Sequence, residues 1–308
     1  MLENVQGQVE GVQYLQRVVD GTLTIPLLLL GPSGTGRRFS ILEAAKEMVK
    51  ADESQVFQIN GGIHPDVMVV EPEKRQDLKA EAVRRIIEKT KFKPARAKVR
   101  FLILDGIDKA TPAASNALLK VLEEAPDHIR FFLLAEDLSA VLPTIRSRCT
   151  SVRYRRLSEK FIQEKLRDHT ENDARALVCS RLAEGSIGRA IYYLNSGKLP
   201  LRDKMLGALS EVARGDLKAL FATVDSVSDD LSIALPFLEH LLHDLIMIPH
   251  NPTLLTNTDK ADALGKLRGQ LGDQKIQTLI SGLRGVQSRA TSPINLSFHI
   301  KTALSSAF

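Results

Sequence analysis

The stretch GPSGTGRRFS, which begins at Gly31, has the glycine spacing of a phosphate-binding loop, G-x-x-x-x-G-K-[ST]. Gly31 and Gly36 occupy the two glycine positions, with Gly34 between them. In such loops the glycines let backbone N–H groups approach phosphates, the lysine reaches the outer phosphates and the hydroxyl ligates Mg²⁺. Here the lysine position is Arg37 and the hydroxyl position is Arg38. The loop therefore keeps its glycines and lacks the two side chains that act on its ligand.

Two interpretations of this loop stay open. In the first, a nucleotide binds passively, and its phosphates would be held by Gly31, Gly34, Thr35, Gly36 and Arg37. In the second, the loop is a tight strand–helix turn that never holds a nucleotide. A guanidinium at position 38 cannot ligate a metal and would repel one, so no metal site is expected here.

The run FLILDGID is a second candidate for phosphate chemistry. In ATPases of the phosphate-loop class, an apolar strand ends in Asp-Glu, where Asp supports Mg²⁺ and Glu positions the attacking water. Asp105 is present, but the Glu position is Gly106, and Asp108 is not an obvious substitute. Hydrolysis therefore lacks two independent parts, the metal-ligating hydroxyl and the water-activating carboxylate.

Apolar runs alternate with amphipathic segments in the first half of the chain, which is the arrangement needed to position such loops. Strands are predicted at Ile25–Leu30, Val67–Val70, Val99–Leu104 and Phe131–Ala135. Helices are predicted at Val9–Val19, Arg37–Lys50, Leu78–Lys91 and Ala113–Glu124. This alternation is typical of an α/β fold with a mainly parallel sheet.

Helical spacing replaces strand-like runs after about Leu157. Helices are predicted at Phe161–His169, Ala174–Ala183, Ile187–Leu194 and Leu231–Ile248. We therefore expect three domains: an α/β nucleotide-binding-like domain at 1–157, a small helical lid at 158–200 and an all-α collar at 201–308.

Composition limits the class of protein. The 308 residues carry 42 Lys+Arg against 37 Asp+Glu, a mild excess that either polyanion contact or a solvated surface explains. Only Cys149 and Cys179 are present, which indicates a reducing compartment and cannot supply a zinc quartet. The N-terminus lacks a signal-peptide pattern, and no apolar run is long enough for a bilayer. We expect a cytoplasmic protein with no membrane partner.

Two sequence motifs occur together in a combination that is specific. Asn116-Ala117-Leu118-Leu119-Lys120 leads into Leu122-Glu123-Glu124, and Ser147-Arg148-Cys149 follows. With the HPD stretch at His64, these motifs resemble the AAA+ clamp-loader subunits of bacterial replicative polymerases, most closely the delta-prime type of DNA polymerase III. The resemblance covers roughly residues 4–196.

The resemblance implies a function. Family members form a ring through the collar, bind ATP between subunits, and use the Arg of the SRC motif in trans on the neighbour's γ-phosphate. Here that residue is Arg148, and a guanidinium suits a phosphate whose charge builds in the transition state. The implied partners are gamma/tau-like and delta-like subunits, with the sliding clamp and primer-template DNA contacted through the assembly.

Other family positions give mixed support. The segment Val5–Gln8 resembles the box that lies near the adenine in active relatives. The sensor-1 position falls at Glu136, an acid that is unsuited to face a γ-phosphate, and the sensor-2 arginine position falls at Gly188, one residue before Arg189. The typical four-cysteine zinc module is missing, because no cysteine lies between Gly36 and His64. We expect no zinc, no required cofactor and a divergent member.

Two further clusters have ordinary explanations. Five basic residues, Lys91, Lys93, Arg96, Lys98 and Arg100, could contact DNA phosphates, but a solvated loop is the preferred interpretation. His240, His243 and Asp244 could be drawn as a metal site, yet a helix rich in leucine favours a structural role.

The sequence thus predicts a delta-prime-like clamp-loader subunit that supplies an arginine finger without hydrolysing ATP itself. It would belong to a DNA-directed DNA polymerase complex by association. An active gamma-type ATPase is the alternative from the enzyme class, disfavoured by the missing Lys-Ser/Thr and Asp-Glu pairs. A DNA-binding scaffold that shares the fold is the alternative from the binding class.

Overall fold

The computed structural model describes residues 2–73, 77–284, 286 and 293–307. The chain forms two compact units: Met1–Ser158 with Gly185–Gly188, and Glu159–Glu184 with Arg189–Phe308. The three-part division into 1–157, 158–200 and 201–308 stays a prediction. Among the described residues, no helix combines the length and the apolar character needed to cross a bilayer.

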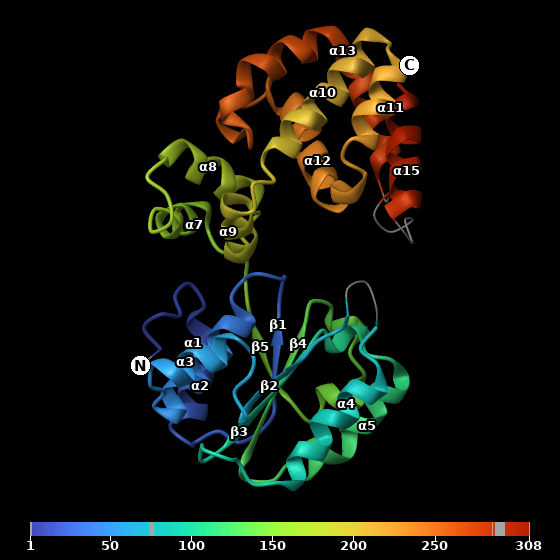
Figure 1. The fold of residues 1–308 in the computed structure, drawn as a ribbon. Helices are drawn as coiled ribbons and strands as arrows, with labels where there is room; N and C mark the ends of the chain where they lie inside the picture. Colours follow the sequence, from blue (N-terminus) through green and yellow to red (C-terminus); the bar gives the residue numbers. More distant parts are fainter. Residues whose placement is uncertain (1, 74–76, 285, 287–292, 308) are drawn as a thin grey trace. The chain divides into compact units, whose positions relative to one another are not determined.

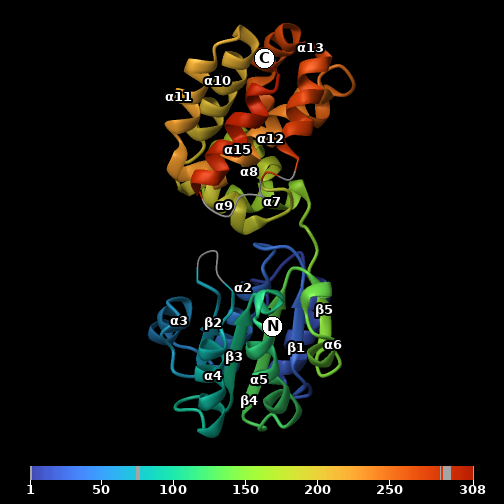
Figure 2. The same cartoon turned by 90° about the vertical axis from the view of Figure 1, so that its right-hand side faces the viewer.

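A parallel sheet forms the centre of the first unit (Figure 1). Within the described part of the chain its strands are β1 (Leu27–Leu30), β2 (Val67–Val70), β3 (Arg100–Asp105), β4 (Ile129–Ala135) and β5 (Thr150–Arg153). Their order is β2-β3-β4-β1-β5, so β2 and β5 are the edges (Figure 2). The sequence predicted the first four strands, and the structure confirms them, β2 with the predicted bounds and the others with shifted ends. It missed β5, because only Val152 is buried in that strand.

Helices cover both faces of this sheet. The helices are α1 (Val9–Val19), α2 (Arg37–Val49), α3 (Glu53–Asn60), α4 (Ala80–Glu88), α5 (Pro112–Glu123) and α6 (Pro143–Arg146), and short 3-10 turns lie at Lys89–Lys91, Ile107–Lys109 and Leu138–Ala140. Figure 1 shows α1 and α2 on one side of the strands and α4 and α5 on the other. Alternate strand residues face the two layers, for example Leu29 toward the first and Leu28 toward the second. Strands buried on both faces explain the continuous apolar runs.

The second unit is helical throughout its described residues. It contains α7 (Glu159–Leu166), α8 (Asp173–Leu182), most of α9 (Ile187–Asn195), α10 (Pro200–Arg214), α11 (Leu217–Asp225), α12 (Leu231–Met247), α13 (Ala261–Leu283) and α15 (Pro293–Ser305). Short 3-10 turns lie at Ser228–Asp230, Pro252–Leu254 and Thr258–Lys260. In this unit α10 packs on α11 and α12, and α13 packs on α12 and α15. The predicted all-α character of this region is confirmed.

One buried carboxylate organises the loop before β3. Asp66 is fully buried and accepts the backbone N–H groups of Ala95, Arg96 and Ala97 at 2.7, 2.7 and 3.0 Å. Arg100 adds a salt bridge at 3.1 Å and is itself 5% exposed. Burial alone would raise the pKa of Asp66, but these hydrogen bonds together hold the pKa below its ordinary value.

Asp66→Asn should lower the free energy of unfolding by about 3 kcal/mol at pH 7, because Arg100 is left as a buried, unpaired charge. The depressed pKa means that this stabilisation is present above the unfolded-state value of 3.8 and is lost as the pH falls through the lower folded-state pKa. Urea unfolding of both proteins at pH 7 and below pH 4 would measure the difference. The exposed Glu88→Gln is the control, and an Asp66→Asn variant as stable as this control would contradict the prediction.

Candidate functional site

Gly31, the first residue of the glycine loop between β1 and α2, packs closely against the end of β5 and bonds to the end of β4. Gly31 adopts φ 152°, and a Cβ there would overlap the carbonyl oxygen of Tyr154. Its N–H donates to the carbonyl of Ala135 at 3.1 Å, and Tyr154 N–H donates to the carbonyl of Leu30 at 2.7 Å. Only glycine fits this position, whether or not a ligand binds.

The Tyr154 ring lies beneath the same loop. Its hydroxyl lies 2.6 Å from Oγ of Ser40 on α2, and the ring leaves no room for a Cβ at Gly11 on α1. Burial raises the pKa of Tyr154 to about 12, while Ser40 and Arg37 act in the opposite direction. The tyrosine therefore joins α1, α2 and the loop through contacts that require no nucleotide.

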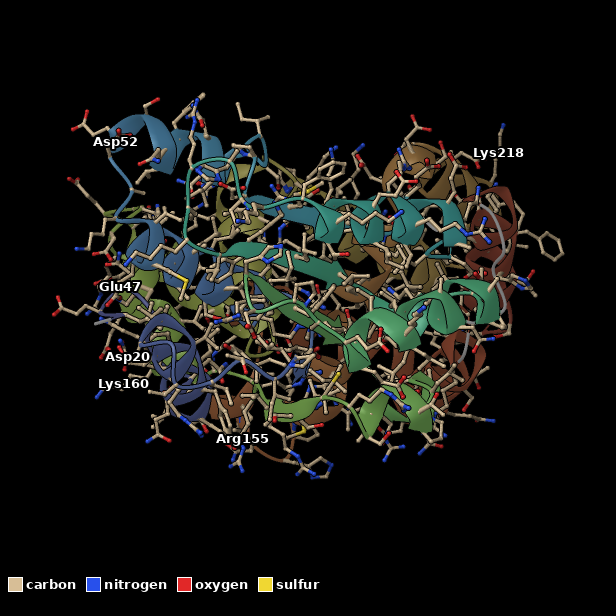
Figure 3. The ribbon with its side chains drawn as sticks, turned by 90° about the horizontal axis from the view of Figure 1, so that it is seen from below. Asp20, Glu47, Asp52, Arg155, Lys160 and Lys218 are labelled. Atoms are coloured by element: carbon tan, nitrogen blue, oxygen red, sulfur yellow. The ribbon has the colours of Figure 1, made fainter. Side chains whose placement is uncertain are left out.

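Thr35 and Gln8 stabilise the loop from within. The Thr35 hydroxyl donates to the carbonyl of Pro32 at 2.8 Å, and Thr35 is 1% exposed. Nε2 of the buried Gln8 donates to the carbonyls of Thr35 at 3.0 Å and Arg155 at 2.8 Å. Arg155 itself is exposed, at the position labelled in Figure 3. Gln8, which belongs to the segment expected near the adenine, thus bridges the loop and the end of β5.

Arg37 replaces the lysine in position but turns into the protein. It is 6% exposed, and Nη1 donates to the carbonyl of Ala135 at the end of β4. Nη2 lies 3.8 Å from Oε1 of Glu136. The guanidinium is therefore already engaged by the edge of the sheet.

Arg38 also has a partner of its own. Its Nη1 lies 2.6 Å from Oε2 of Glu71, just after β2. At the position where active relatives bind Mg²⁺ through a hydroxyl, this chain instead has an ion pair, so residue 38 itself offers no oxygen ligand to a metal.

The end of β3 provides one acid and no catalytic glutamate. Burial raises the pKa of Asp105 above its ordinary value, although Arg37 and Arg38 act in the opposite direction. Gly106 adopts φ 77°, and a Cβ there would lie 3.0 Å from Cγ of Pro72. The position of the missing glutamate is therefore one that a side chain occupies only with strain.

Asp108 has a structural task. Its Oδ2 accepts the backbone N–H groups of Glu136 at 3.0 Å and Asp137 at 3.1 Å, which holds the turn after β4. The sensor-1 residue Glu136 is thus fixed by its backbone, and its carboxylate lies beside Arg37.

A cavity of about 480 Å³ opens at this edge of the sheet. Its lining includes the carboxylates of Glu71, Glu73, Asp77, Asp105, Asp108 and Glu136, against the cations Arg37 and Lys109. This excess of acids repels a triphosphate, whose own charge is strongly negative. Sequence reasoning missed this feature, because the acids come from three separate segments of the chain, at the ends of β2, β3 and β4.

Gly188, at the expected sensor-2 position, lies against the backbone of the glycine loop. Gly188 N–H donates to the carbonyl of Gly34 at 3.0 Å, and a Cβ at Gly188 would lie 3.2 Å from Cα of Gly34. An arginine could not be placed there without moving the phosphate loop. Arg189, the next residue, lies 3.6 Å from Glu184.

Arg148 lies apart from the loop, directly after α6. Its Nε donates to Oε1 of Glu123 at 2.8 Å, Nη2 donates to the same oxygen, and Nη1 donates to the carbonyl of Thr144 at 2.7 Å. Its side chain is 30% exposed. The structure thus brings the LEE and SRC motifs into contact at the surface, where a guanidinium can meet another molecule.

One residue of each of the two other clusters has a structural role. Arg100 does not belong to the solvated basic loop, because it is buried against Asp66; the four other basic residues of that group are not buried. Asp244 is fully buried and accepts the N–H groups of Thr256 and Asn257, each at 2.8 Å. No group of three or more metal-binding side chains was found among the described residues.

A parallel sheet in this order, a glycine loop between β1 and α2 and an acid at the end of β3 are the arrangement of the AAA+ fold. Residues 7–158 match the family model described as DNA polymerase III, delta subunit. By this match and by the relatives below, the chain is similar to clamp-loader subunits of the delta-prime type.

Individual relatives agree with this placement. DNA polymerase III subunit delta' of Escherichia coli is 28% identical over 237 residues, 76% of this chain and 70% of that protein. Replication factor C subunit 5 of Mus musculus is 34% identical over 180 residues, 55% of this chain. The chain spans about half the length (49%) of this mouse relative. A DNA polymerase III gamma subunit-related protein of Thermotoga maritima shares the fold, with a TM-score of 0.61, 19% identity and coverage of 97% and 100% of the two chains.

Gly106→Glu, which restores the glutamate of active ATPases, should lower the free energy of unfolding by about 2 kcal/mol and create no ATP hydrolysis. The left-handed φ and the nearby Pro72 ring cause the loss of stability. Thermal unfolding and phosphate release by the chain alone would measure both effects. Gly265→Glu, on an exposed face of α13 with open space, is the control. Hydrolysis at an unchanged melting temperature would refute the prediction.

Proposed function

We propose that this chain is the delta-prime-type subunit of a clamp loader and helps to load a sliding clamp onto primed DNA. Within the ring it supplies Arg148 to the ATP of a neighbouring subunit and hydrolyses no ATP itself. The observation that carries the proposal is Arg148: it is partly exposed and held on the surface, while the chain's own site is occupied by its own side chains.

The chemistry of the partner site supports this role. An arginine that enters a neighbour's site places forked donors beside a γ-phosphate, where negative charge grows during transfer. The proposed partners are gamma/tau-like and delta-like subunits, with the clamp and primer-template DNA contacted through the assembly. Relatives named as a DNA polymerase III delta' subunit and a replication factor C subunit favour the same assignment.

The alternative, an active gamma-type ATPase, fits the site less well. Four positions of its mechanism, at residues 38, 106, 136 and 188, hold an ion pair, a glycine in a left-handed conformation, an acid and a close backbone contact. An active ATPase site would require a different change at each of these four positions. No nucleotide is required for the proposed role.

Arg148→Ala in this subunit should lower ATP turnover of a reconstituted loader by about three decades at the affected site, as for loss of an arginine finger. The motor subunits stay unchanged, and turnover is measured per site in the presence of clamp and primed DNA. Arg146→Ala is the matched control, because Arg146 is exposed and lies two residues away. If ATP turnover were the same in the Arg148→Ala and Arg146→Ala loaders, Arg148 would not be an arginine finger.

The isolated chain should bind Mg·ATP more weakly than about 1 mM, measured by calorimetry. The reason is the excess of carboxylates around the cavity beside the loop. A Glu73→Gln, Glu136→Gln double variant removes two of these charges and should bind more tightly, whereas Glu88→Gln, far along α4, should not. Micromolar binding by the unchanged chain would contradict this electrostatic argument.

A further inference from the structure

We infer that Glu123 is a positioning residue for Arg148: it sets the direction in which the guanidinium is presented to the neighbour's phosphate. This inference rests on the proposed function of Arg148. It concerns a residue of the LEE motif, which the sequence singled out without a role of its own.

The contact uses one particular edge of the guanidinium. Nε and Nη2 of Arg148 both donate to Oε1 of Glu123, and Nη1 donates to the carbonyl of Thr144, with a longer contact of 3.4 Å to Oγ of Ser147. The Nε–Nη2 edge is therefore held by Glu123. The second hydrogen of Nη2 remains to donate to a phosphate, and Nη1 can join it in the forked geometry that arginine favours by giving up the long Ser147 contact.

The two residues are carried by a rigid support. Glu123 is the last residue of α5, and Arg148 follows α6 by two residues. Leu122 and Ile145, their neighbours on these helices, are buried in the same hydrophobic cluster, at 4% and 0% exposure. The spacing between carboxylate and guanidinium is thus set by the core of the first unit.

Stability does not explain the pair. The side chains of Arg148 and Glu123 are 30% and 47% exposed, and ion pairs at such sites contribute about 0–1 kcal/mol. An arginine free at the surface samples many rotamers, and ordering it in the transition state costs free energy. A guanidinium that is already held in one orientation avoids that cost at the moment of reaction.

Glu123→Ala is the variant that tests this role, in the reconstituted loader with unchanged motor subunits. The kcat of the affected site should fall on the order of tenfold, the range expected when a catalytic group loses its orientation, while KM for ATP stays unchanged. Glu123→Gln keeps one oxygen acceptor and should give an intermediate rate. Glu124→Ala, the adjacent exposed acid, is the matched control and should equal the wild type. Urea unfolding of each variant checks that stability is unchanged.

A double variant separates positioning from any other effect. If Glu123 acts through Arg148, Glu123→Ala combined with Arg148→Ala should be no slower than Arg148→Ala alone. A further fall in the double variant, or a Glu123→Ala rate equal to that of Glu124→Ala, overturns the inference while the finger assignment stands. An Arg148→Ala variant with unchanged turnover overturns the finger itself, and the inference with it.

Discussion

The close approach of Gly31 to the backbone of Tyr154 is the constraint on which the loop region depends. Because no side chain fits at residue 31, β1 and the end of β5 can pass in contact, and the tyrosine ring can fill the space between α1 and α2. A Cβ methyl group at residue 31 would clash with the Tyr154 carbonyl and push the two strands apart. This packing requires glycine at position 31 whether or not the loop holds a phosphate, which explains how this glycine can be present without the lysine.

Positions that depart from the pattern of active ATPases take part in the packing of the fold. Gly106 turns beside Pro72, Asp108 holds the turn at Glu136, and Gly188 donates to the loop itself. A side chain at Gly106 or Gly188 would strain the backbone or press on a neighbouring group, so substitution costs stability at these two positions. Since a domain has only about 5–15 kcal/mol of net stability, such a cost is a sizeable fraction of it.

The sequence predicted the elements that have a clear local pattern, and it missed the contacts between residues that are far apart in the chain. Runs such as LLLL at β1 predict a strand buried on both faces, whereas β5, with one buried residue, has too little pattern. The motif frame singled out Arg38 and Gly106, but not the partners that they have in the fold, Glu71 and Pro72. Arg100 was grouped with exposed basic residues because its partner Asp66 lies far back in the chain. The pairing of Glu123 with Arg148 was equally hidden, since only folding brings α5 beside α6.

The two functional regions of the first unit are supported by different cores. Tyr154, Leu29 and Ile41 belong to the cluster on the α1–α2 face, which carries the glycine loop. Leu122 and Ile145 belong to the cluster on the α4–α5 face, which carries Glu123 and Arg148. Substitutions in the loop therefore repack one face of the sheet and leave the support of the arginine unchanged, since packing effects fall off for residues without shared partners. The proposed role of Arg148 therefore does not depend on whether the glycine loop holds a nucleotide.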